Sequence, residues 1–331
     1  VDIDKAEQAR TELLRREKEL TEDVRKETGV TIEPWVATSI AKAFDAVGLS
    51  YDRTEKTGVP AFTKQFLANH ENPLAQKIVK IREFNKANTT FIETILEHSH
   101  KGRIHCDFNP LRSDEGGTVT GRFSSSNPNL QQIPARDPEI KAMIRGLFIP
   151  EEGCKWGSFD YASQEPRWLA HYCSTLKGVH RHPQIDEVVQ MYHDGNADFH
   201  QMVADIAGIS RKQAKTVNLG IMYGMGKAKL AGVMDITDEE ATHLLAKYHD
   251  RVPFVKGMAD MTMRRAEEVG HIRTWLGRKC RFNMWQPKSY GFSKPMPLEA
   301  AAKEYGGKSA IKRAFTYKAL NRLIQGSSAD Q

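Results

Sequence analysis

Two N-terminal segments repeat apolar residues at the spacing of an α-helix. In residues 3–28 the repeat lies in a highly charged background, with aspartate available to cap the first turn and Gly29 to end the helix. The second repeat begins at Asn72-Pro73, a capping residue followed by proline at the first helical position, and continues to His98. The intervening "YDRTEKTGVP" has the composition of a loop. The pattern therefore predicts an antiparallel helical lobe.

The pattern changes near residue 103. "GRIHCDF" alternates polar and apolar residues as a strand does. Residues 109–138 follow and are dense in Gly, Ser, Asn and Pro, which predicts a long loop of the kind that is usually functional or disordered. "CKWGSFD" then predicts a buried strand that ends at Asp160, and Glu165-Pro166 begins a helix after a short turn.

The C-terminal half is mainly helical. Residues 187–268 have a helical pattern almost throughout, "HIRTWLGRKCRF" predicts a hairpin, and "QPKSYGFSKPMP" predicts a loop. A last helix is expected from about Leu298 to Leu323. Together these elements predict an α+β fold that is mostly helical.

Composition narrows the class of protein. The 331 residues suffice for two or three domains or one multi-lobed enzyme, and 40% hydrophobic content supports a substantial core. A net charge of +6 suits a polyanionic partner without identifying one. The four cysteines lack CxxC spacing, so neither a disulfide framework nor a zinc site is expected. No apolar run approaches the ~20 residues of a membrane span, and there is no signal peptide, so a cytoplasmic protein is expected.

One predicted helix carries a stripe whose two ends differ in chemistry. "RKQAKTVNLGIMYGMG" places Arg211, Lys215, Leu219 and Tyr223 at steps of four, so their side chains fall within about 120° of arc. An amphipathic surface helix with solvated charges explains the cations but not the apolar and aromatic end. A ligand with phosphates at one end and a base at the other fits the whole face.

Asp160 is a second candidate site residue. A carboxylate at the end of a buried strand is costly unless it is paired, hydrogen-bonded or bound to a metal. Asp160 could cap the helix that begins near Gln164. It could equally bind Mg²⁺, which takes one or two carboxylates together with water and substrate phosphate oxygens. The residues alone leave both interpretations open.

Five segments in fixed order resemble motifs of the family A DNA polymerases, the group of bacterial DNA polymerase I and several phage replicases. The first three resemble TGRLSS…PNLQNIP, DYSQIELR and RxxxKxxxFGxxYG. The five segments are "TVTGRFSSSNPNLQQIP", "FDYASQEPR", "RKQAKTVNLGIMYG", "RTWLGRK" and "NRLIQGSSAD". The likeness covers nearly the whole chain, and the order of five matches makes chance an inadequate explanation.

The resemblance implies roles at the reaction centre. Asp160 would hold the catalytic metals, two Mg²⁺ ions in the complete enzyme, with the Tyr161 carbonyl as a second ligand. Glu165 would lie under the sugar of the incoming nucleotide and exclude a 2′-hydroxyl. The primer 3′-oxygen would attack the α-phosphate in line, with Asp160 and Lys215 as the catalytic residues.

The resemblance also implies how the nucleotide is bound. Arg211 and Lys215, helped by His200, would grip the triphosphate and neutralise charge on the pyrophosphate. Leu219 would lie near the sugar, and Tyr223 would stack at the templating position.

Further residues would contact DNA. Arg122 and Gln325 would reach the minor groove at the primer end, with Asn321 and Gln132 nearby, where acceptors are nearly common to all base pairs. Arg278 and its neighbours would hold backbone phosphates. The partners implied are primer-template DNA and deoxynucleoside triphosphates, in a bacterial or phage-infected cell and away from any membrane.

The fold that the resemblance implies is a right hand. Residues 1–105 would form a helical thumb and 106–186 the first part of the palm. Residues 187–300 would form the fingers, which rotate shut over a correct pair, and 301–331 would return to an incomplete palm.

Two departures from the family pattern carry consequences. The family's second metal carboxylate lies in a His-Asp-Glu turn downstream of the QGxxAD segment, and the sequence stops at Gln331. The expectation is therefore a truncated polymerase region that is inactive or nearly so alone. Leu219 replaces the usual Phe or Tyr, which predicts altered handling of sugar-modified nucleotides.

Two rival functions stay open. A single-subunit RNA polymerase shares a similar helix, but Glu165 would crowd a ribose. A non-catalytic DNA-binding module derived from a polymerase fits the missing carboxylate. It leaves the joint retention of Asp160, Arg211, Lys215 and Tyr223 unexplained.

Overall fold

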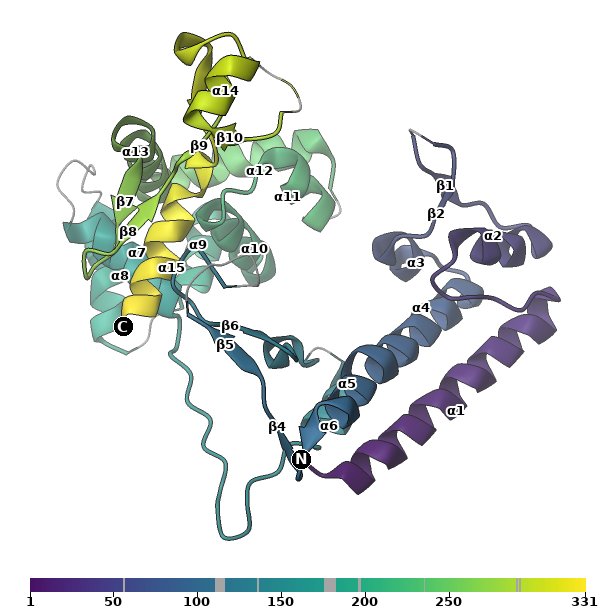
Figure 1. The fold of residues 1–331 in the computed structure, drawn as a ribbon. Coiled ribbons are helices and arrows are strands. Elements are labelled where there is room, and N and C mark those ends of the chain that lie inside the picture. The colour runs from purple at the N-terminus through teal and green to yellow at the C-terminus, as the bar shows by residue number, and fades with distance from the viewer. Residues whose placement is uncertain are drawn as a thin grey trace. The chain divides into compact units, whose positions relative to one another are not determined.

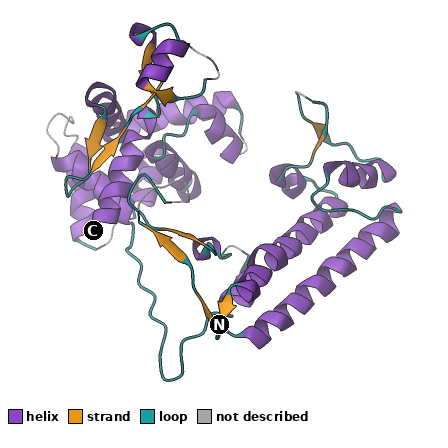
Figure 2. Ribbon diagram, in the orientation of Figure 1, coloured by secondary structure: helices purple, strands orange, loops and turns teal. Residues whose placement is uncertain are grey.

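The computed structural model describes residues 1–55, 57–110, 117–135, 137–175, 183–195, 198–234, 236–289, 291 and 293–331. The chain forms two units (Figure 1). Unit 1 comprises Val1–Asn109 and Ser124–Ser158, and unit 2 comprises Pro110–Phe123 and Phe159–Gln331. Helices dominate both units, and the short strands within each unit pair antiparallel (Figure 2). This confirms the prediction of an α+β fold that is mostly helical. Within the described residues, none of the helices is long and apolar enough to span a bilayer.

Unit 1 is built on two long helical segments that pack side by side (Figure 1). Helix α1 (Ile3–Thr28) begins at Asp2, whose carboxylate accepts the Lys5 N–H, and ends at Gly29 with φ 73°. Helix α4 (Pro73–Lys86) is capped by Asn72 and passes through a π-helical segment, Ala87–Ile92, into α5 (Glu93–Glu97). Both predicted N-terminal helices are thereby confirmed.

The other elements of unit 1 are short. They are α2 (Ala37–Ala46), β1 (Asp52–Arg53), β2 (Pro60–Ala61), α3 (Lys64–Asn69), β3 (Ser99–His100), β4 (Arg103–Ile104), β5 (Asp107–Asn109), β6 (Ser124–Ser126), a 3₁₀ turn (Leu130–Gln132) and α6 (Pro138–Arg145). The strands form three antiparallel pairs, β1–β2, β3–β4 and β5–β6. The strand predicted for "GRIHCDF" is therefore split between β4 and β5, and part of the predicted long loop pairs with β5 as β6.

Two apolar cores hold unit 1 together. One surrounds the fully buried Phe44, whose ring contacts Phe62 with centroids 4.9 Å apart, and joins α2 to α4. The other surrounds Leu13 and Ile92 and joins α1 to α6 through Ile144. Burying such large apolar side chains contributes about 1.5–3 kcal/mol each.

Unit 2 packs most of its helices around one core that includes the fully buried Tyr248. The helices are α7 (Gln164–Thr175), α8 (Pro183–His193), α9 (Phe199–Ala207), α10 (Arg211–Met222), α11 (Lys227–Met234), α12 (Asp238–Arg251), α13 (Pro253–Val269), α14 (Leu298–Glu304) and α15 (Ala319–Asp330). Capping boxes at Ser210 and Thr237 begin α10 and α12. The predicted run of helices over 187–268 is confirmed for the described residues.

The strands of unit 2 form a hairpin and a three-stranded sheet. Strands β7 (His271–Arg273) and β8 (Lys279–Arg281) pair antiparallel, as predicted. Strand β9 (Met284–Pro287) lies between β10 (Met296–Pro297) and β11 (Ile311–Arg313), so the ends of the predicted 286–297 loop are paired.

The single helix expected from Leu298 to Leu323 is wrong. Helix α14 ends at Glu304, and Gly306 and Gly307 follow with φ values of 83° and 104°. These backbone conformations favour glycine and stop a right-handed helix. Strand β11 and a 3₁₀ turn, Thr316–Lys318, intervene before α15 begins at Ala319.

Candidate active site

The segment before α7 differs from its predicted structure. Residues 155–160 form no strand and are exposed, with Trp156 at 68% and Phe159 at 96% exposure. A buried strand needs hydrogen-bonded neighbours on its edges, and none of the described strands pairs with this segment. The predicted buried strand is therefore wrong. Asp160 is exposed, and it is Ser163 that directly precedes α7, so Asp160 does not occupy the cap position.

Four predicted site residues from four different motif segments meet around Glu165 in unit 2. The Glu165 carboxylate, 13% exposed, accepts hydrogen bonds from the Arg122 guanidinium and from the Tyr223 hydroxyl, the latter at 3.0 Å. Gln325 Nε2 donates to the Tyr223 hydroxyl oxygen at 3.1 Å. We call these four residues the Glu165 cluster. They come from the loop before β6, the first turn of α7, the end of α10 and the middle of α15.

Burial and charge in the Glu165 cluster determine that the Tyr223 hydroxyl keeps its proton. Burial raises the pKa of the Tyr223 phenol, and the adjacent Glu165 charge raises it further, although the bond from Gln325 opposes both. Tyr223 therefore keeps its proton and donates to the carboxylate. Tyr223 is still 40% exposed, so its ring can contact a ligand while its hydroxyl is held.

Cationic side chains gather where α9 and α10 meet. Arg211 Nε lies 2.7 Å from Asp198 Oδ2, and Asp198 also caps α9 by accepting the backbone N–H of His200. Lys215 is exposed one turn further along α10, beyond Arg211. We call Arg211, Lys215 and His200 the basic cluster.

The half-buried His200 ring is neutral near pH 7. Burial lowers the pKa of His200, and the positive charges of Lys215 and Arg211 lower it further, while Asp198 opposes them. The basic cluster therefore carries two fixed positive charges and one neutral imidazole. The predicted cationic end of the α10 stripe exists, and the aromatic Tyr223 ends the same helix.

Arg278 is held by internal partners. Its guanidinium donates to Asp330 Oδ1 at 2.7 and 2.9 Å, to the Thr120 carbonyl at 2.8 Å and to the Gly326 carbonyl at 2.7 Å. We call these four residues the Arg278 clamp. The close approach requires glycine at 121, where a Cβ would lie 1.6 Å from Arg278 Nη1.

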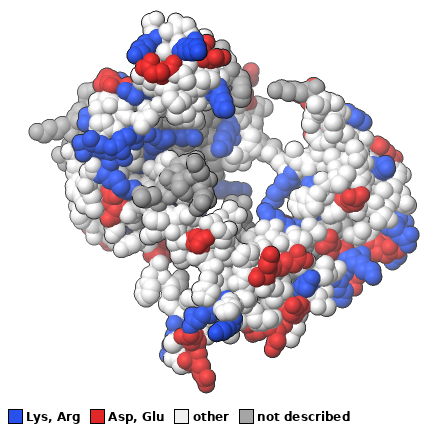
Figure 3. Space-filling model, in the orientation of Figure 1, with Lys and Arg blue, Asp and Glu red and all other residues white. Residues whose placement is uncertain are grey.

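The Arg278 clamp joins the segments that carry Arg122 and Gln325. Gly121 directly precedes Arg122, and Gly326 directly follows Gln325. The predicted phosphate contact of Arg278 stays a prediction. Its neighbours Lys279 and Arg281, with Arg273 on β7, are exposed instead. Figure 3 shows a band of Lys and Arg side chains over this hairpin.

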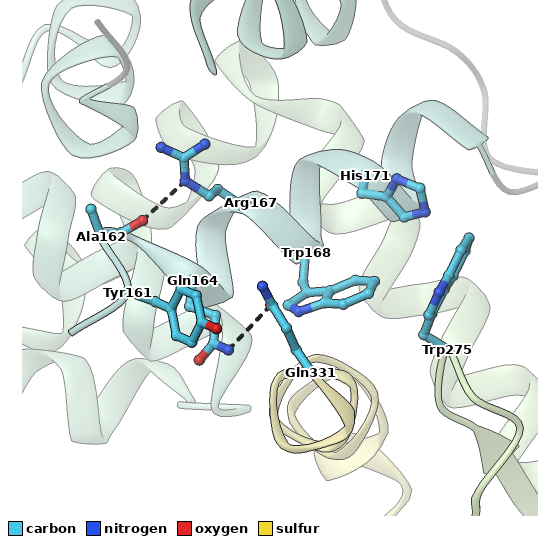
Figure 4. Close-up of a pocket in the computed structure, with 8 residues that line it drawn as sticks. All are labelled: Tyr161, Ala162, Gln164, Arg167, Trp168, His171, Trp275 and Gln331. Atoms are coloured by element: carbon cyan, nitrogen blue, oxygen red, sulfur yellow. Dashed lines mark hydrogen bonds between the residues drawn. The ribbon is translucent and has the colours of Figure 1, made fainter. Parts of the chain in front are cut away.

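A pocket of about 540 Å³ borders the first metal motif (Figure 4). Its walls include Trp168, His171 and Trp275, with the His171 and Trp275 rings 4.7 Å apart edge to face. Gln164 and Gln331 also line it, and Gln164 Nε2 donates to Gln331 Oε1 at 3.3 Å. Tyr161 lines the pocket but the Asp160 carboxylate does not. Arg167 lines the pocket as well, so one cation lies among these aromatic side chains.

The donor chemistry near Asp160 fits magnesium only in part. The Asp160 carboxylate and the Tyr161 carbonyl are oxygen donors of the kind that Mg²⁺ prefers. The described residues contain no group of three or more His, Cys, Asp or Glu side chains placed to hold a metal. One carboxylate is the minimum of a protein magnesium site, and the phosphates of a nucleotide would have to complete it.

Three further predicted site residues take no part in the hydrogen bonds of these clusters among the described residues. Gln132 lies in unit 1, at the end of the Leu130–Gln132 turn, where its side chain is exposed. Asn321 is half-buried in the first turns of α15. Leu219 is half-buried and packs against the core of unit 2.

Sequence reasoning missed three residues that support the site. Asp198 binds Arg211, Asp330 binds Arg278, and the buried Asn218 contacts His200. Asn218 had a signal, because it is a polar residue between the buried Val217 and the half-buried Leu219 of α10. No sequence signal pointed to Asp330, because its partner Arg278 is 52 residues away in sequence.

Comparison with known proteins shows the family to which the chain belongs. The model of DNA polymerase family A matches residues 3–331, so the chain belongs to that family. It is 34% identical over 379 residues to a DNA-directed DNA polymerase of Pseudomonas phage M6, covering 100% of this chain and 53% of that protein. It is 31% identical over 301 residues to the thermostable DNA polymerase I of Thermus aquaticus, covering 87% of this chain and 32% of that protein.

A solved structure has the same fold. The chain superposes with a TM-score of 0.73 and 25% identity on the POL domain of Pol1 from M. smegmatis, in complex with DNA primer-template and dNTP, covering 100% of this chain and 54% of the other. The chain spans about half the length, or less, of the relatives named here.

Proposed function

We propose that this chain is the nucleotide-adding region of a template-directed DNA polymerase. The observation that carries the proposal is the Glu165 cluster, which joins residues of four motif segments within unit 2. The basic cluster adds cations on the helix that also supplies Tyr223. The proposal extends to this chain the activity in the relatives' names and the ligands of the solved structure.

Glu165 is the residue that selects deoxyribose in this proposal. Its carboxylate is fixed by Arg122 on one oxygen and by Tyr223 on both. A side chain held in this way cannot move aside when a 2′-hydroxyl approaches, so ribose would meet an immobile, negatively charged wall. Arg122 and Gln325 would at the same time present donors to the minor-groove acceptors of the primer-end base pair.

The basic cluster binds the triphosphate. Arg211 and Lys215 place two positive charges along one face of α10, and His200 adds an imidazole. The primer 3′-oxygen attacks the α-phosphorus, the bond to the pyrophosphate oxygen breaks, and the 3′-hydroxyl proton leaves to solvent. Negative charge grows on the pyrophosphate, where the basic cluster stabilises it. Asp160 and the Tyr161 carbonyl would hold Mg²⁺, which stabilises the attacking and leaving oxygens when bound.

Primer extension by the polymerase that contains this chain tests the proposal, with a primer-template, Mg²⁺ and either deoxy- or ribonucleotides. The wild type should incorporate deoxynucleotides and reject ribonucleotides. Glu165→Ala should raise ribonucleotide incorporation at least tenfold relative to deoxynucleotide incorporation. The control Glu187→Ala, on α8, should leave the ratio unchanged.

The rivals predict different results. A ribonucleotide polymerase would prefer ribonucleotides without any substitution. A non-catalytic DNA-binding module would bind the primer-template in a salt-dependent way and incorporate nothing. Either result would overturn the proposal.

A further inference from the structure

We propose that Asn218 and Tyr248 are positioning residues that fix the tautomer of His200, so that the proton of the neutral ring lies on Nε2 and is available to a triphosphate oxygen. The idea rests on the proposed function for its ligand, but the tautomer itself is a property of the unliganded chain. The contacts that carry it are a chain of two hydrogen bonds, Tyr248 to Asn218 and Asn218 to His200.

Tyr248 sets the first hydrogen bond. It lies on α12 with none of its surface exposed, and its hydroxyl is 2.5 Å from Asn218 Oδ1. Burial raises the pKa of the Tyr248 phenol, so the hydroxyl keeps its proton. A buried O–H that finds no acceptor destabilises the fold. The hydroxyl therefore donates, and the oxygen of the Asn218 amide must face Tyr248.

The orientation of the Asn218 amide determines which nitrogen of the His200 ring carries the proton. Its side chain is 1% exposed on α10, and with Oδ1 facing Tyr248 its Nδ2 points at His200 Nδ1, 3.1 Å away. An amide nitrogen only donates, so His200 Nδ1 must accept and cannot carry a proton. The reversed amide would set its NH₂ group against the Tyr248 hydroxyl, whose proton would then lack an acceptor.

The remaining ring proton is thereby assigned to Nε2. Because the pKa of His200 is lowered chiefly by burial, the ring is neutral near pH 7 and carries one proton. The groups that face the ring are Asp198, Arg211 and Lys215, besides Asn218. A neutral imidazole with Nε2–H can donate to a phosphate oxygen, whereas the other tautomer would present a lone pair to it.

Nuclear magnetic resonance can read the tautomer directly. The 331-residue chain is labelled with ¹⁵N-histidine, and long-range ¹H–¹⁵N correlations are recorded at pH 7.5 without nucleotide. His200→Gln identifies the signal by its loss. The wild type should show Nε2–H at His200. A wild-type spectrum of the Nδ1–H tautomer would overturn the inference.

Two substitutions and a matched control test whether Asn218 and Tyr248 determine the tautomer of His200. Asn218→Asp replaces the donor by a carboxylate that only accepts, so His200 should change to Nδ1–H or become charged. Tyr248→Phe frees the Asn218 amide to rotate, so both tautomers should appear. Tyr192→Phe removes another buried hydroxyl, one without a hydrogen-bond partner among the described residues, and should leave the spectrum unchanged. An unchanged tautomer in both Asn218→Asp and Tyr248→Phe would contradict the inference.

Nucleotide affinity separates the inference from the proposed function. With a deoxynucleoside triphosphate as probe, Tyr248→Phe should weaken binding about twofold or more, in proportion to the fraction of the wrong tautomer. Tyr192→Phe should bind like the wild type. If the tautomer changes as expected but the wild type binds no nucleotide, the proposed function fails and the positioning role stands. If the tautomer changes without any change in affinity, the Nε2–H contact to phosphate is wrong.

Discussion

Two cationic regions of unit 2 differ in what satisfies their charge. In the Arg278 clamp, the guanidinium donates to a carboxylate that is 6% exposed and to two backbone carbonyls. In the basic cluster, Lys215 is exposed and forms no ion pair within the part of the chain that the structure describes, and Arg211 shares one half-exposed carboxylate.

This difference separates charges that hold the fold from charges that can hold a ligand. A cation whose donors are spent on buried acceptors has little left for a phosphate, while an exposed cation keeps its donors for one. The motif matches alone gave Arg278 and Lys215 the same kind of role, as phosphate ligands. The structure shows that Arg278 also fixes the backbone beside Arg122 and Gln325, and its phosphate contact stays a prediction.

The largest effect is expected from breaking the Arg278 clamp. Asp330→Ala leaves the partly buried Arg278 charge without its carboxylate and should lower the free energy of unfolding by about 2–3 kcal/mol, less than for a fully buried pair, because the Arg278 side chain is 36% exposed. Urea denaturation followed by tryptophan fluorescence measures this loss. Lys308→Ala is the control, because it removes a pair whose side chains are 66% and 80% exposed and should cost about 0–1 kcal/mol. Equal losses of unfolding free energy in the two variants would show that the Arg278 clamp stabilises the fold no more than an exposed ion pair does.

Lys215→Ala should weaken nucleotide binding while leaving the stability of the fold nearly unchanged. Its unfolding free energy should stay within about 0.5 kcal/mol of the wild type, because the side chain removed is exposed and has no ion pair among the described residues. Deoxynucleoside triphosphate binding should weaken about tenfold, as expected for loss of a charged hydrogen bond. Fluorescence titration gives the affinity, with Lys229→Ala on α11 as a matched exposed lysine. If Lys215→Ala binds the deoxynucleoside triphosphate as tightly as the wild type, Lys215 is not part of the nucleotide site.

Acid should weaken the Arg278 clamp selectively. Burial raises the pKa of Asp330, but hydrogen bonds from Thr274, Arg278 and the Leu276 N–H outweigh it, so the pKa lies below its ordinary value. A lowered folded-state pKa gives stability that is fully present above the unfolded value of about 3.9 and is lost as pH falls through the folded value.

Asp330→Asn removes this titration. Between pH 6 and pH 3 its stability should fall less steeply than that of the wild type, in denaturation curves recorded at each pH. Parallel slopes would mean that Asp330 is not the group responsible.

The smallest effect is expected at Leu219. This half-buried residue packs on the core of unit 2 within the α10 stripe, where the family usually has Phe or Tyr. Leu219→Phe should change the ratio of dideoxy to deoxy incorporation several-fold, equivalent to about 1 kcal/mol. Competition between the two nucleotides in primer extension measures the ratio, and an unchanged ratio would contradict a role beside the sugar.

Local signals in the sequence predicted α1, α4 and α10 well. Helix α1 lies between Asp2 and Gly29, and α4 begins at Asn72-Pro73, because caps and proline act within one turn of the chain. The stripe of α10 was predictable for the same reason, since its geometry depends only on helical spacing.

Elements that depend on distant partners were not predictable. The apolar run before Asp160 has the composition of a strand, but a strand also needs a neighbour, which composition does not reveal. The Glu165 cluster and the Arg278 clamp contain hydrogen bonds between residues up to 158 positions apart, and no local pattern encodes such a pairing. The motif resemblance named all four members of the Glu165 cluster, yet it did not reveal which of them bond to one another.

Binding of the next correct nucleotide tests the central claim most directly. The chain is mixed with a primer-template whose primer ends in a dideoxynucleotide, so that no addition can occur, and each of the four deoxynucleoside triphosphates is titrated in turn. If the Glu165 cluster and the basic cluster together form the insertion site, the nucleotide complementary to the template should bind at least tenfold more tightly than the others. Equal affinity for all four, or binding of DNA without any nucleotide, would contradict the account.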